Sequence, residues 1–394
     1  MNKEIDQSLL DRIFPRMVEW RRYLHQHPEL SFQEYNTSRF VAETLRNLGM
    51  DVRTGVGGHG VVGILKGSLE GPVVALRADI DALPIQDEKE CGYASKTEGV
   101  MHACGHDGHT ATLLGVASYF SERRSLLRGE IRFLFQPAEE VIPGGAIRMI
   151  GDGALDGVDV IYGVHLWTPL EAGKVSSAPG PMMASVDDFV IDVIGKGGHG
   201  GLPHDTVDSV VVGASIVLHL QTVVSRSVDP LQPAVVSVGS IQAGTTQNVI
   251  ADRCRLKGTV RTFDEHTRTL IRDRIEATVR NSCAMYGAEA EIQYLEGYPT
   301  LVNDERETER FFRVATALFG EAKVERCRPV MPAEDFAYYL QRVPGCFLFV
   351  GAGNERDGIV HPHHHPRFDI DEASMMNAAK VMIRMAVDYA LDGK

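Results

Sequence analysis

Apolar residues recur at three- and four-residue spacing near the N-terminus, and this pattern predicts an amphipathic helix over residues 3–24. A second helical pattern covers residues 37–48 and ends at Gly49, since glycine readily adopts the left-handed conformation that closes a helix. Short apolar runs bounded by glycine and proline come next, and such runs are typical of buried strands. These runs are residues 61–65, 73–76, 131–135 and 160–164, and a further helix is predicted over residues 110–120. The alternation of helix and strand patterns predicts an α/β domain.

Three of these strands run directly into polar side chains. The residues concerned are Asp79 and Asp81 after the second strand, Glu139 and Glu140 after the third, and His165 after the fourth. In an open α/β sheet, the carboxyl ends of the strands border the crevice that binds ligands. The sequence therefore predicts a functional site at this edge of the sheet.

From residue 185 the pattern changes to that of an inserted domain. Strands and helices are predicted in the order β-α-β-β-α-β, which is the ferredoxin-like pattern. They cover residues 186–194, 205–225, 234–241, 254–261, 265–285 and 289–295. The α/β pattern then resumes, with elements predicted at residues 305–318, 334–341, 346–350 and 372–391. We therefore predict a first domain of residues 1–184 and 297–394, a mixed open sheet flanked by helices, into which residues 185–296 are inserted.

Length, charge and cysteine content narrow the class of protein. The 394 residues exceed the roughly 250–300 at which a single core stops growing, which agrees with two domains. The net charge of -13 argues against nucleic acid as a partner, because phosphate binding needs concentrated Lys and Arg. No apolar run reaches the ~18 residues of a membrane span and the N-terminus has no secretory pattern, so we expect no membrane partner. Six scattered cysteines favour free thiols and a cytoplasmic location.

Residues 101–110 bring three histidines, a cysteine and an aspartate together, with two glycines between them. So many borderline and soft ligands in one loop predict a metal site. Cys104 and His106 are the sharpest pair, because a Cys-x-His spacing lets both side chains approach one ion when the backbone is turned. The alternative is a loop whose histidines only cap backbone groups.

Other residues can complete such a site. Adjacent carboxylates beside metal ligands divide naturally into one ligand and one general base, although Glu139 and Glu140 could also form an exposed acidic helix start after Pro137. His165 is a candidate ligand or a core histidine bonded to a backbone carbonyl. One of the three histidines at 363–365 can add a last ligand. Five protein ligands are one too many for a single tetrahedral zinc and suit two ions that share a thiolate bridge.

A series of collinear motifs carries a family resemblance over nearly the whole chain. The motifs are R-A-D-I-D-A-L-P, M-H-A-C-G-H-D-G-H-T-A, Q-P-A-E-E, G-V-H-L-W, G-G-H-G-G-L-P-H, N-V-I-A-D, G-T-V-R-T-F and A-E-D-F-A-Y-Y. Together they resemble the dinuclear metalloamidohydrolases that include hippurate hydrolase and indole-acetyl-amino-acid hydrolase, within the wider aminoacylase and carboxypeptidase family. The resemblance implies a zinc-exopeptidase-like catalytic domain whose insert serves as a lid and in dimerisation.

The resemblance also implies roles for individual residues. The implied metal ligands are Cys104, His106, Glu140, His165 and His364, with His365 as the fallback for the last of them. Glu139 would be the general base, and Asp81 would orient a metal ligand by hydrogen-bonding to it. His199 would reach an active site, in several relatives that of a partner subunit. Asn248 and Arg261 would face the carboxylate of the substrate.

The implied activity is metal-dependent hydrolysis of the amide bond of N-acyl amino acids, such as N-acetyl, benzoyl or indole-acetyl conjugates, or of short peptides. The cofactor would be two divalent ions per chain, with zinc or manganese favoured and nickel or cobalt as further candidates. Relatives outside this branch have His where Asp79 stands and a bridging Asp where Cys104 stands, so the cysteine branch is the right comparison. We expect a homodimer.

Three alternatives stay open from the sequence. The same site could serve a carboxypeptidase or dipeptidase. Cys104 could instead be the nucleophile of a cysteine hydrolase, with His102 or His106 as its base. The chain could also be a non-catalytic metal- or ligand-binding protein, although binding alone does not need Glu139.

Overall fold

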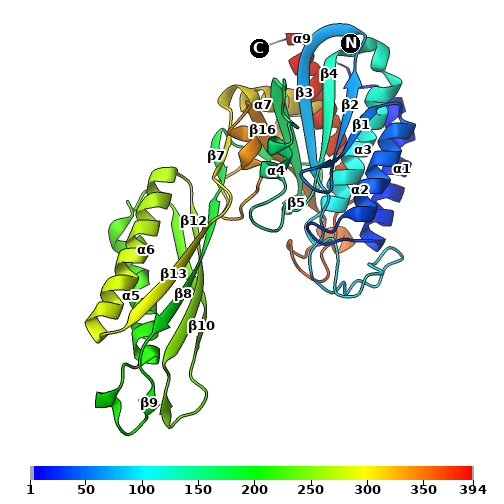
Figure 1. Cartoon of the computed structure of the whole chain (residues 1–394). Coiled ribbons are helices and arrows are strands. Elements are labelled where there is room, and N and C mark those ends of the chain that lie inside the picture. Colours follow the sequence, from blue (N-terminus) through cyan, green and yellow to red (C-terminus); the bar gives the residue numbers. More distant parts are fainter. Residues whose placement is uncertain (1–3, 393–394) are drawn as a thin grey trace. The chain divides into compact units, whose positions relative to one another are not determined.

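The structure, a computed structural model, describes residues 4–392, so the predicted helix start at residue 3 lies outside the described residues. The chain divides into two compact units (Figure 1). Unit 1 comprises Met1–Met182, Val302–Arg328 and Asp335–Lys394, and unit 2 comprises Met183–Leu301 and Pro329–Glu334.

Unit 1 is built on an eight-stranded mixed sheet in the order β1-β2-β4-β3-β5-β16-β6-β15. Its strands are β1 (Asp51–Val56), β2 (Gly60–Lys66), β3 (Leu69–Asp79), β4 (Arg128–Gln136), β5 (Val160–Glu171), β6 (Val175–Ser177), β15 (Val324–Arg326) and β16 (Gly345–Gly353). The four neighbours β4, β3, β5 and β16 are mutually parallel, so their carboxyl ends share one edge. Two short strands, β7 (Gly180–Met183) and β14 (Leu301–Asn303), pair separately.

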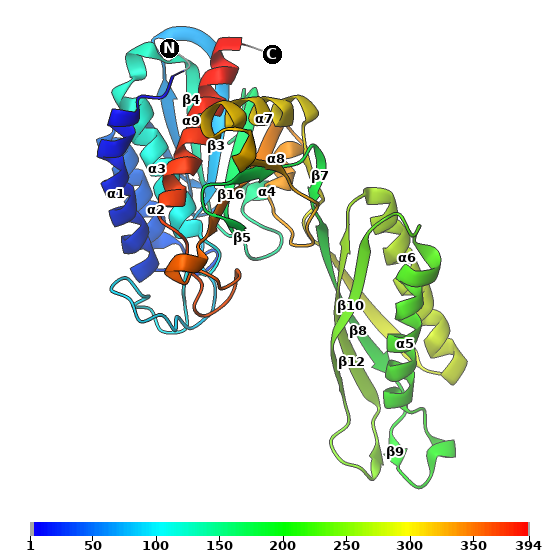
Figure 2. The same ribbon diagram turned by 180° about the vertical axis from the view of Figure 1, so that it is seen from behind.

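Helices flank this sheet, as Figures 1 and 2 show from opposite sides. They are α1 (Gln7–Gln26), α2 (Tyr35–Asn47), α3 (His106–Glu122), α4 (Ala146–Gly151), α7 (Glu305–Phe319), α8 (Ala337–Leu340) and α9 (Ala373–Asp392). Helix α1 begins after Asp6, whose carboxylate accepts the Leu9 N–H, and buries Ile13 and Met17 on its apolar face. Helices α3 and α9 pack on β3 and enclose the apolar core of this unit. The predicted mixed open sheet flanked by helices is confirmed.

Three predicted boundaries in unit 1 are wrong in ways that affect the site. Helix α3 begins at His106 rather than at residue 110, because Gly105 at φ 90° turns the chain directly into the helix. Strand β5 continues through His165 to Glu171, because β16 pairs with it beyond the point where pairing with β3 stops. The predicted helix at 334–341 contracts to the single turn of α8.

Unit 2 has the predicted ferredoxin-like order. Its elements are β8 (Ser185–Ile194), α5 (Ser209–Ser227), β10 (Ala234–Ala243), β12 (Arg253–Thr262), α6 (Glu265–Tyr286) and β13 (Glu289–Glu296). The strands form an antiparallel sheet in the order β10-β12-β8-β13, and both helices pack on it around a core of its own. A small two-stranded sheet joins β9 (Gly198–His199) to β11 (Val249–Ile250). Short 3-10 helices lie at Arg124–Leu126, Pro203–Asp205, Glu321–Lys323 and Glu355–Asp357.

Helix α5 is the one helix of residues 4–392 that is long and apolar enough to cross a membrane by length and composition. Its buried side chains Val212, Ile216 and Leu220 belong to the core of unit 2, which is an ordinary role for an apolar helix. All six cysteines are free thiols.

Candidate metal centre

The five metal ligands that the sequence predicts lie together within unit 1. They come from the loop before α3, the first turn of α3, the turn after β4, the middle of β5, and the loop after β16. Cys104 belongs to two candidate ligand sets, and within each set the ligand atoms all lie within 4.8 Å of one another. The sets are Cys104 with His106 and His165, and Cys104 with Glu140 and His364. Cys104 is therefore the residue that would serve both ions if the two sets each held one.

Hydrogen bonds to Nδ1 leave Nε2 of the two buried candidate ligands His106 and His165 facing the other candidate ligands. His106 Nδ1 lies 3.2 Å from Asp81 Oδ1, and since a carboxylate only accepts, this nitrogen carries the proton. His165 Nδ1 donates to the Leu166 carbonyl at 3.0 Å, which leaves Nε2 facing Cys104 Sγ at 3.5 Å. In both rings Nε2 is therefore the nitrogen available for a metal, as the predicted orienting role of Asp81 requires.

Two buried polar atoms of the candidate ligands have no hydrogen-bond partner among residues 4–392. They are His106 Nε2 and Glu140 Oε1, which lie 3.8 Å apart. Buried polar atoms in native proteins are almost always paired, so an unpaired nitrogen and oxygen facing each other need a common explanation. A divalent cation between them would satisfy both, and an imidazole and a carboxylate are donors that zinc and manganese accept. The residues therefore fit a metal.

The loop after β16 distinguishes the three neighbouring histidines. His364 N donates to the Ala103 carbonyl at 2.8 Å, which fixes this loop against the segment 101–110 that contains Cys104 and His106. The Nε2 atom of His364 lies 3.3 Å from Glu140 Oε1. His363 Nδ1 lies 3.9 Å from Cys104 Sγ, but its Nε2 already accepts the Thr168 N–H. The fallback His365 accepts the N–H of residue 367 and stacks on His361. Among the described residues, only His364 of the three belongs to a candidate ligand set.

Electrostatics around Cys104 oppose the cysteine-nucleophile alternative. Burial, together with the negative charges of Glu140 and Glu139, raises the pKa of the Cys104 thiol well above its usual value. A nucleophilic cysteine needs the reverse shift and a base beside it. Neither His106 Nε2 nor a ring nitrogen of the buried His102 bonds to Cys104 or to any other described residue. His165 Nε2 does face the sulfur at 3.5 Å, but burial holds the pKa of His165 well below its usual value, which makes it a poor base. A bound cation would instead favour the thiolate.

A buried network beneath the centre involves residues whose contacts the sequence did not indicate. Asp79 accepts His109 Nδ1–H at 2.6 Å on one oxygen and an Arg77 N–H at 2.7 Å on the other. His109 Nε2 accepts the Leu166 N–H at 2.9 Å. Asp79 and His109 also fall in a candidate ligand set with His106, but their atoms are already satisfied, so we regard them as support rather than ligands. The spacing of His109 three positions after His106 at a helix start was the available signal.

The adjacent glutamates do not form the exposed helix start that was the alternative. Glu139 is only 7% exposed, and the next helix, α4, begins at Ala146. The side chains of Glu139 and Glu140 both approach His106 within a fourth candidate ligand set. The turn that carries them is held by carboxylates, because Glu34 Oε1 accepts the Ala138 N–H at 2.9 Å and Asp81 Oδ2 accepts the Glu140 N–H at 3.1 Å.

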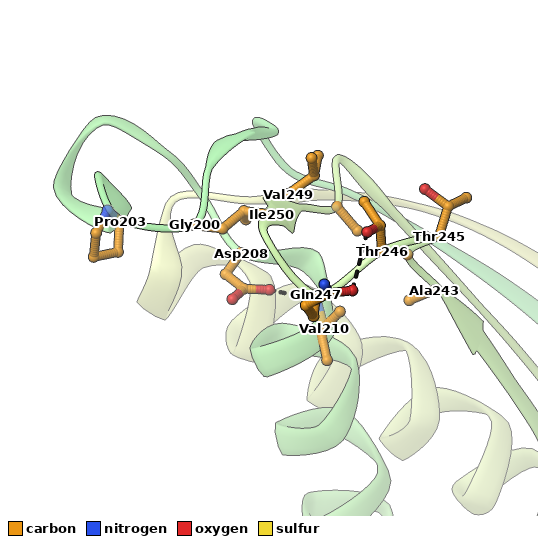
Figure 3. Close-up of a pocket in the computed structure, with 12 residues that line it drawn as sticks. Gly200, Pro203, Asp208, Val210, Ala243, Thr245, Thr246, Gln247, Val249 and Ile250 are labelled. Carbon is orange, nitrogen blue, oxygen red and sulfur yellow. Dashed lines mark hydrogen bonds between the residues drawn. The ribbon is translucent and has the colours of Figure 1, made fainter.

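The remaining predicted site residues lie in unit 2, at two separate places. His199 in β9 and Asn248 before β11 are exposed and lie in neighbouring loops, where Gly200 N donates to the Asn248 carbonyl at 2.9 Å. These loops border an open hollow (Figure 3). Arg261 is half-buried and lies near the C-terminal end of β12, whereas the two loops lie near the start of that strand. Its guanidinium donates to the Val260 carbonyl and makes no ion pair with a described residue.

This fold and donor set define a metal-dependent hydrolase. The chain belongs to the peptidase family M20/M25/M40, whose model matches residues 75–388. It is 51% identical over 303 residues to an N-acyl-L-amino acid amidohydrolase of Geobacillus stearothermophilus, covering 77% of this chain and 82% of the relative. It is 41% identical over 377 residues to thermostable carboxypeptidase 1 of Saccharolobus solfataricus, covering 95% of each.

A solved structure gives the same answer for the fold. A dinuclear metal-binding peptidase of the M20 family from Bacillus subtilis superimposes with a TM-score of 0.81 at 35% identity, covering 96% of this chain and 99% of that one. The predicted resemblance and the predicted enzyme class, an amidohydrolase or metallopeptidase acting on linear amides, are thereby confirmed.

Proposed function

We propose that this chain hydrolyses the amide bond of N-acyl amino acids with two divalent ions, zinc or manganese, held by the five predicted ligands. The observation that supports this most is the pair of unpartnered buried atoms, His106 Nε2 and Glu140 Oε1, beside the buried Glu139. The amidohydrolase and dinuclear peptidase relatives support the same assignment. Six free thiols agree with a cytoplasmic enzyme.

Each residue has a role in the proposed reaction. Bound ions supply positive charge that activates a water molecule and polarises the substrate carbonyl. Glu139 takes a proton from the attacking water and passes it to the nitrogen of the leaving amine. His199 donates a hydrogen bond to the oxygen that gains negative charge as the water adds. The carbon–nitrogen bond then breaks, and a carboxylic acid and an amino acid leave.

Arg261 supports a substrate with a free carboxylate. Burial lowers the pKa of this guanidinium because the charged form is desolvated, while Asp188 and Asp187 oppose the shift only from a distance. A half-buried guanidinium without an ion pair is costly unless an anion completes it. The planar fork of Arg suits bidentate binding of a carboxylate.

Replacing Arg261 by alanine should lower kcat/KM on N-acyl amino acids by about 10- to 150-fold, since a hydrogen bond to a charged group contributes about 1.5–3 kcal/mol. The loss on the matching amides, which lack the carboxylate, should be far smaller. The control is Arg255→Ala on the same strand, because Arg255 already pairs with Asp192 at 2.7 Å. Equal losses on acid and amide would remove the clamp and with it the proposed substrate class.

The carboxypeptidase alternative uses the same clamp and differs in what lies on the other side of the scissile bond. A carboxypeptidase of this family accepts an aminoacyl group there, whereas an aminoacylase accepts a simple acyl group. Comparing N-acetyl, N-benzoyl and N-indoleacetyl amino acids with dipeptides that share the same C-terminal residue separates the two activities.

We further propose a homodimer in which each active site combines two copies of the chain. From Arg253 to Arg261 strand β12 covers eight steps of about 3.4 Å, or about 27 Å. An N-acyl amino acid is too small to bridge that span, so His199 and Asn248 can meet the same substrate as Arg261 only if they come from the other copy. This supports action of His199 in trans.

A dimer contact is available at the edge strand β10 and on the adjoining helix α5. Leu218 of α5 is 70% exposed and contributes an apolar side chain to this surface. Leu218→Glu should therefore shift the mass in solution from two chains of 43.3 kDa to one and reduce kcat/KM. The control is Met285→Glu on α6, which is 68% exposed and lies near the other edge of the sheet. A wild-type monomer with full activity would contradict the shared site.

A further inference from the structure

Three non-glycine residues in the described part of the chain have a positive φ. They are Phe32 at 62°, Ala138 at 51° and His364 at 66°. The left-handed conformation is unfavourable for a non-glycine residue, and it persists only where the surroundings impose it. Ala138 immediately precedes Glu139, so the strained position sets the direction in which the proposed base leaves the turn.

One carboxylate oxygen connects two of these strained residues. Glu34 Oε1 accepts the Phe32 N–H at 2.9 Å and the Ala138 N–H at 2.9 Å. Glu34 is fully buried, and its Oε2 has no hydrogen-bond partner in the described part of the chain. The carboxylate thus ties the segment before α2 to the turn after β4, across 104 positions of sequence.

The rest of this turn is fixed on its other side. Asp81 Oδ2 accepts the Glu140 N–H at 3.1 Å and the Ser31 hydroxyl at 2.7 Å, and Gly145 N donates to the Ala138 carbonyl at 3.0 Å. The N–H groups of the two residues beside Glu139, Ala138 and Glu140, are therefore both bound to buried carboxylates. Both carboxylates also hold residues of the same segment, Ser31 and Phe32.

Glu34 does not contribute to α2 as a side-chain cap. It occupies the N-cap position without a side-chain cap bond. Glu29 performs that task, because its carboxylate accepts the N–H groups of Asn36 at 2.9 Å and Thr37 at 2.8 Å. Burial and the nearby Asp81 raise the pKa of Glu34 to about 7, so this carboxylate is held in an unfavourable place. Helix stability alone does not account for such a residue.

We propose that Glu34 is a positioning residue for the turn after β4, which carries Glu139. By accepting the Ala138 N–H, Glu34 holds Ala138 in its left-handed conformation and so directs the Glu139 side chain at the reacting water. This inference rests on the proposed role of Glu139 as the base. Glu34 itself touches neither substrate nor metal in this account.

The test begins with Glu34→Ala and its conservative counterpart Glu34→Gln. Glu34→Ala should lower kcat by about 10- to 100-fold, since a misplacement of about 1 Å costs that much, while KM and metal content stay unchanged. Glu34→Gln should keep at least about a third of wild-type kcat, because the amide oxygen still accepts both N–H groups, if more weakly. The matched control Glu29→Ala removes a carboxylate from the same helix start without touching the turn, and it should keep wild-type kcat.

A second readout is independent of activity. In metal-free protein, amide hydrogen exchange measured by mass spectrometry over residues 137–140 should become faster in Glu34→Ala and not in Glu29→Ala. Should Glu34→Ala fail to fold, Glu34→Asp replaces it, since its carboxylate is one methylene too short to reach Ala138 N.

Combining the variants with Glu139→Gln decides the outcome. If Glu34 acts through Glu139, Glu34→Ala should change kcat by less than about twofold in the Glu139→Gln background, because coupled residues are not additive. Additive losses, loss of metal, or equal behaviour of Glu34→Ala and Glu29→Ala would overturn the inference. If Glu139→Gln alone keeps wild-type kcat, the proposed function fails first, and that result is distinct from a failure of Glu34.

Discussion

Glu139→Gln should lower kcat by about 10²- to 10⁴-fold while metal content stays at the wild-type level, since that is the usual share of general acid–base catalysis. Glutamine keeps the size of the side chain and nearly all of its packing at this buried position. It removes only the carboxylate that takes the proton from water and returns it to the leaving amine. The measurement is kcat on an N-acyl amino acid, together with elemental analysis of the same sample.

The adjacent residue provides the control for this prediction. Glu140 carries the oxygen without a hydrogen-bond partner that faces His106 Nε2 and His364 Nε2. Glu140→Gln should therefore contain less metal than the wild type, and its loss of activity should follow from that loss of metal. Excess divalent ion should then restore part of its activity, but it should restore none to Glu139→Gln. If the two variants behaved the other way round, the assignment of ligand and base would be reversed.

Removal of the metal should abolish activity altogether. A chelator removes the ions and leaves the buried ligand atoms without partners. Because metal bound to the folded state stabilises it, the Tm of the metal-free protein should also be lower. Reloading with zinc, manganese, cobalt or nickel in turn should restore activity to different degrees and thereby identify the native ion. Cys104→Ser should weaken loading, since a neutral hydroxyl bridges two ions poorly. Activity that survives complete chelation would contradict a metal mechanism.

The convergence of four candidate ligands could be predicted from the sequence because each of the four follows a recognisable local pattern. Cys104 and His106 stand two positions apart. Glu140 comes shortly after the apolar strand β4, and His165 directly follows the apolar run 160–164 within β5, which is parallel to β4 and close to it in the sheet. Parallel strands bring their carboxyl ends to one edge, so these residues converge although they are distant in sequence. The extent of β5 was wrong because pairing with β16, which lies about 180 positions later, prolongs it past His165.

Other parts of the site depend on contacts without a local signal. The choice of His364 among three adjacent histidines follows from its left-handed backbone and its bond to Ala103, neither of which the run of histidines specifies. Glu34 stands in an ordinary segment before a helix, and only the folded chain brings it to the turn after β4. His109 likewise becomes a support for Asp79 only once α3 begins at His106.

The measurement that tests the central claim most directly is the metal content of protein purified without chelators, determined by elemental analysis together with activity. The account predicts about two divalent ions per chain, with activity rising in proportion to occupancy. Fully active protein that contains no metal would contradict it.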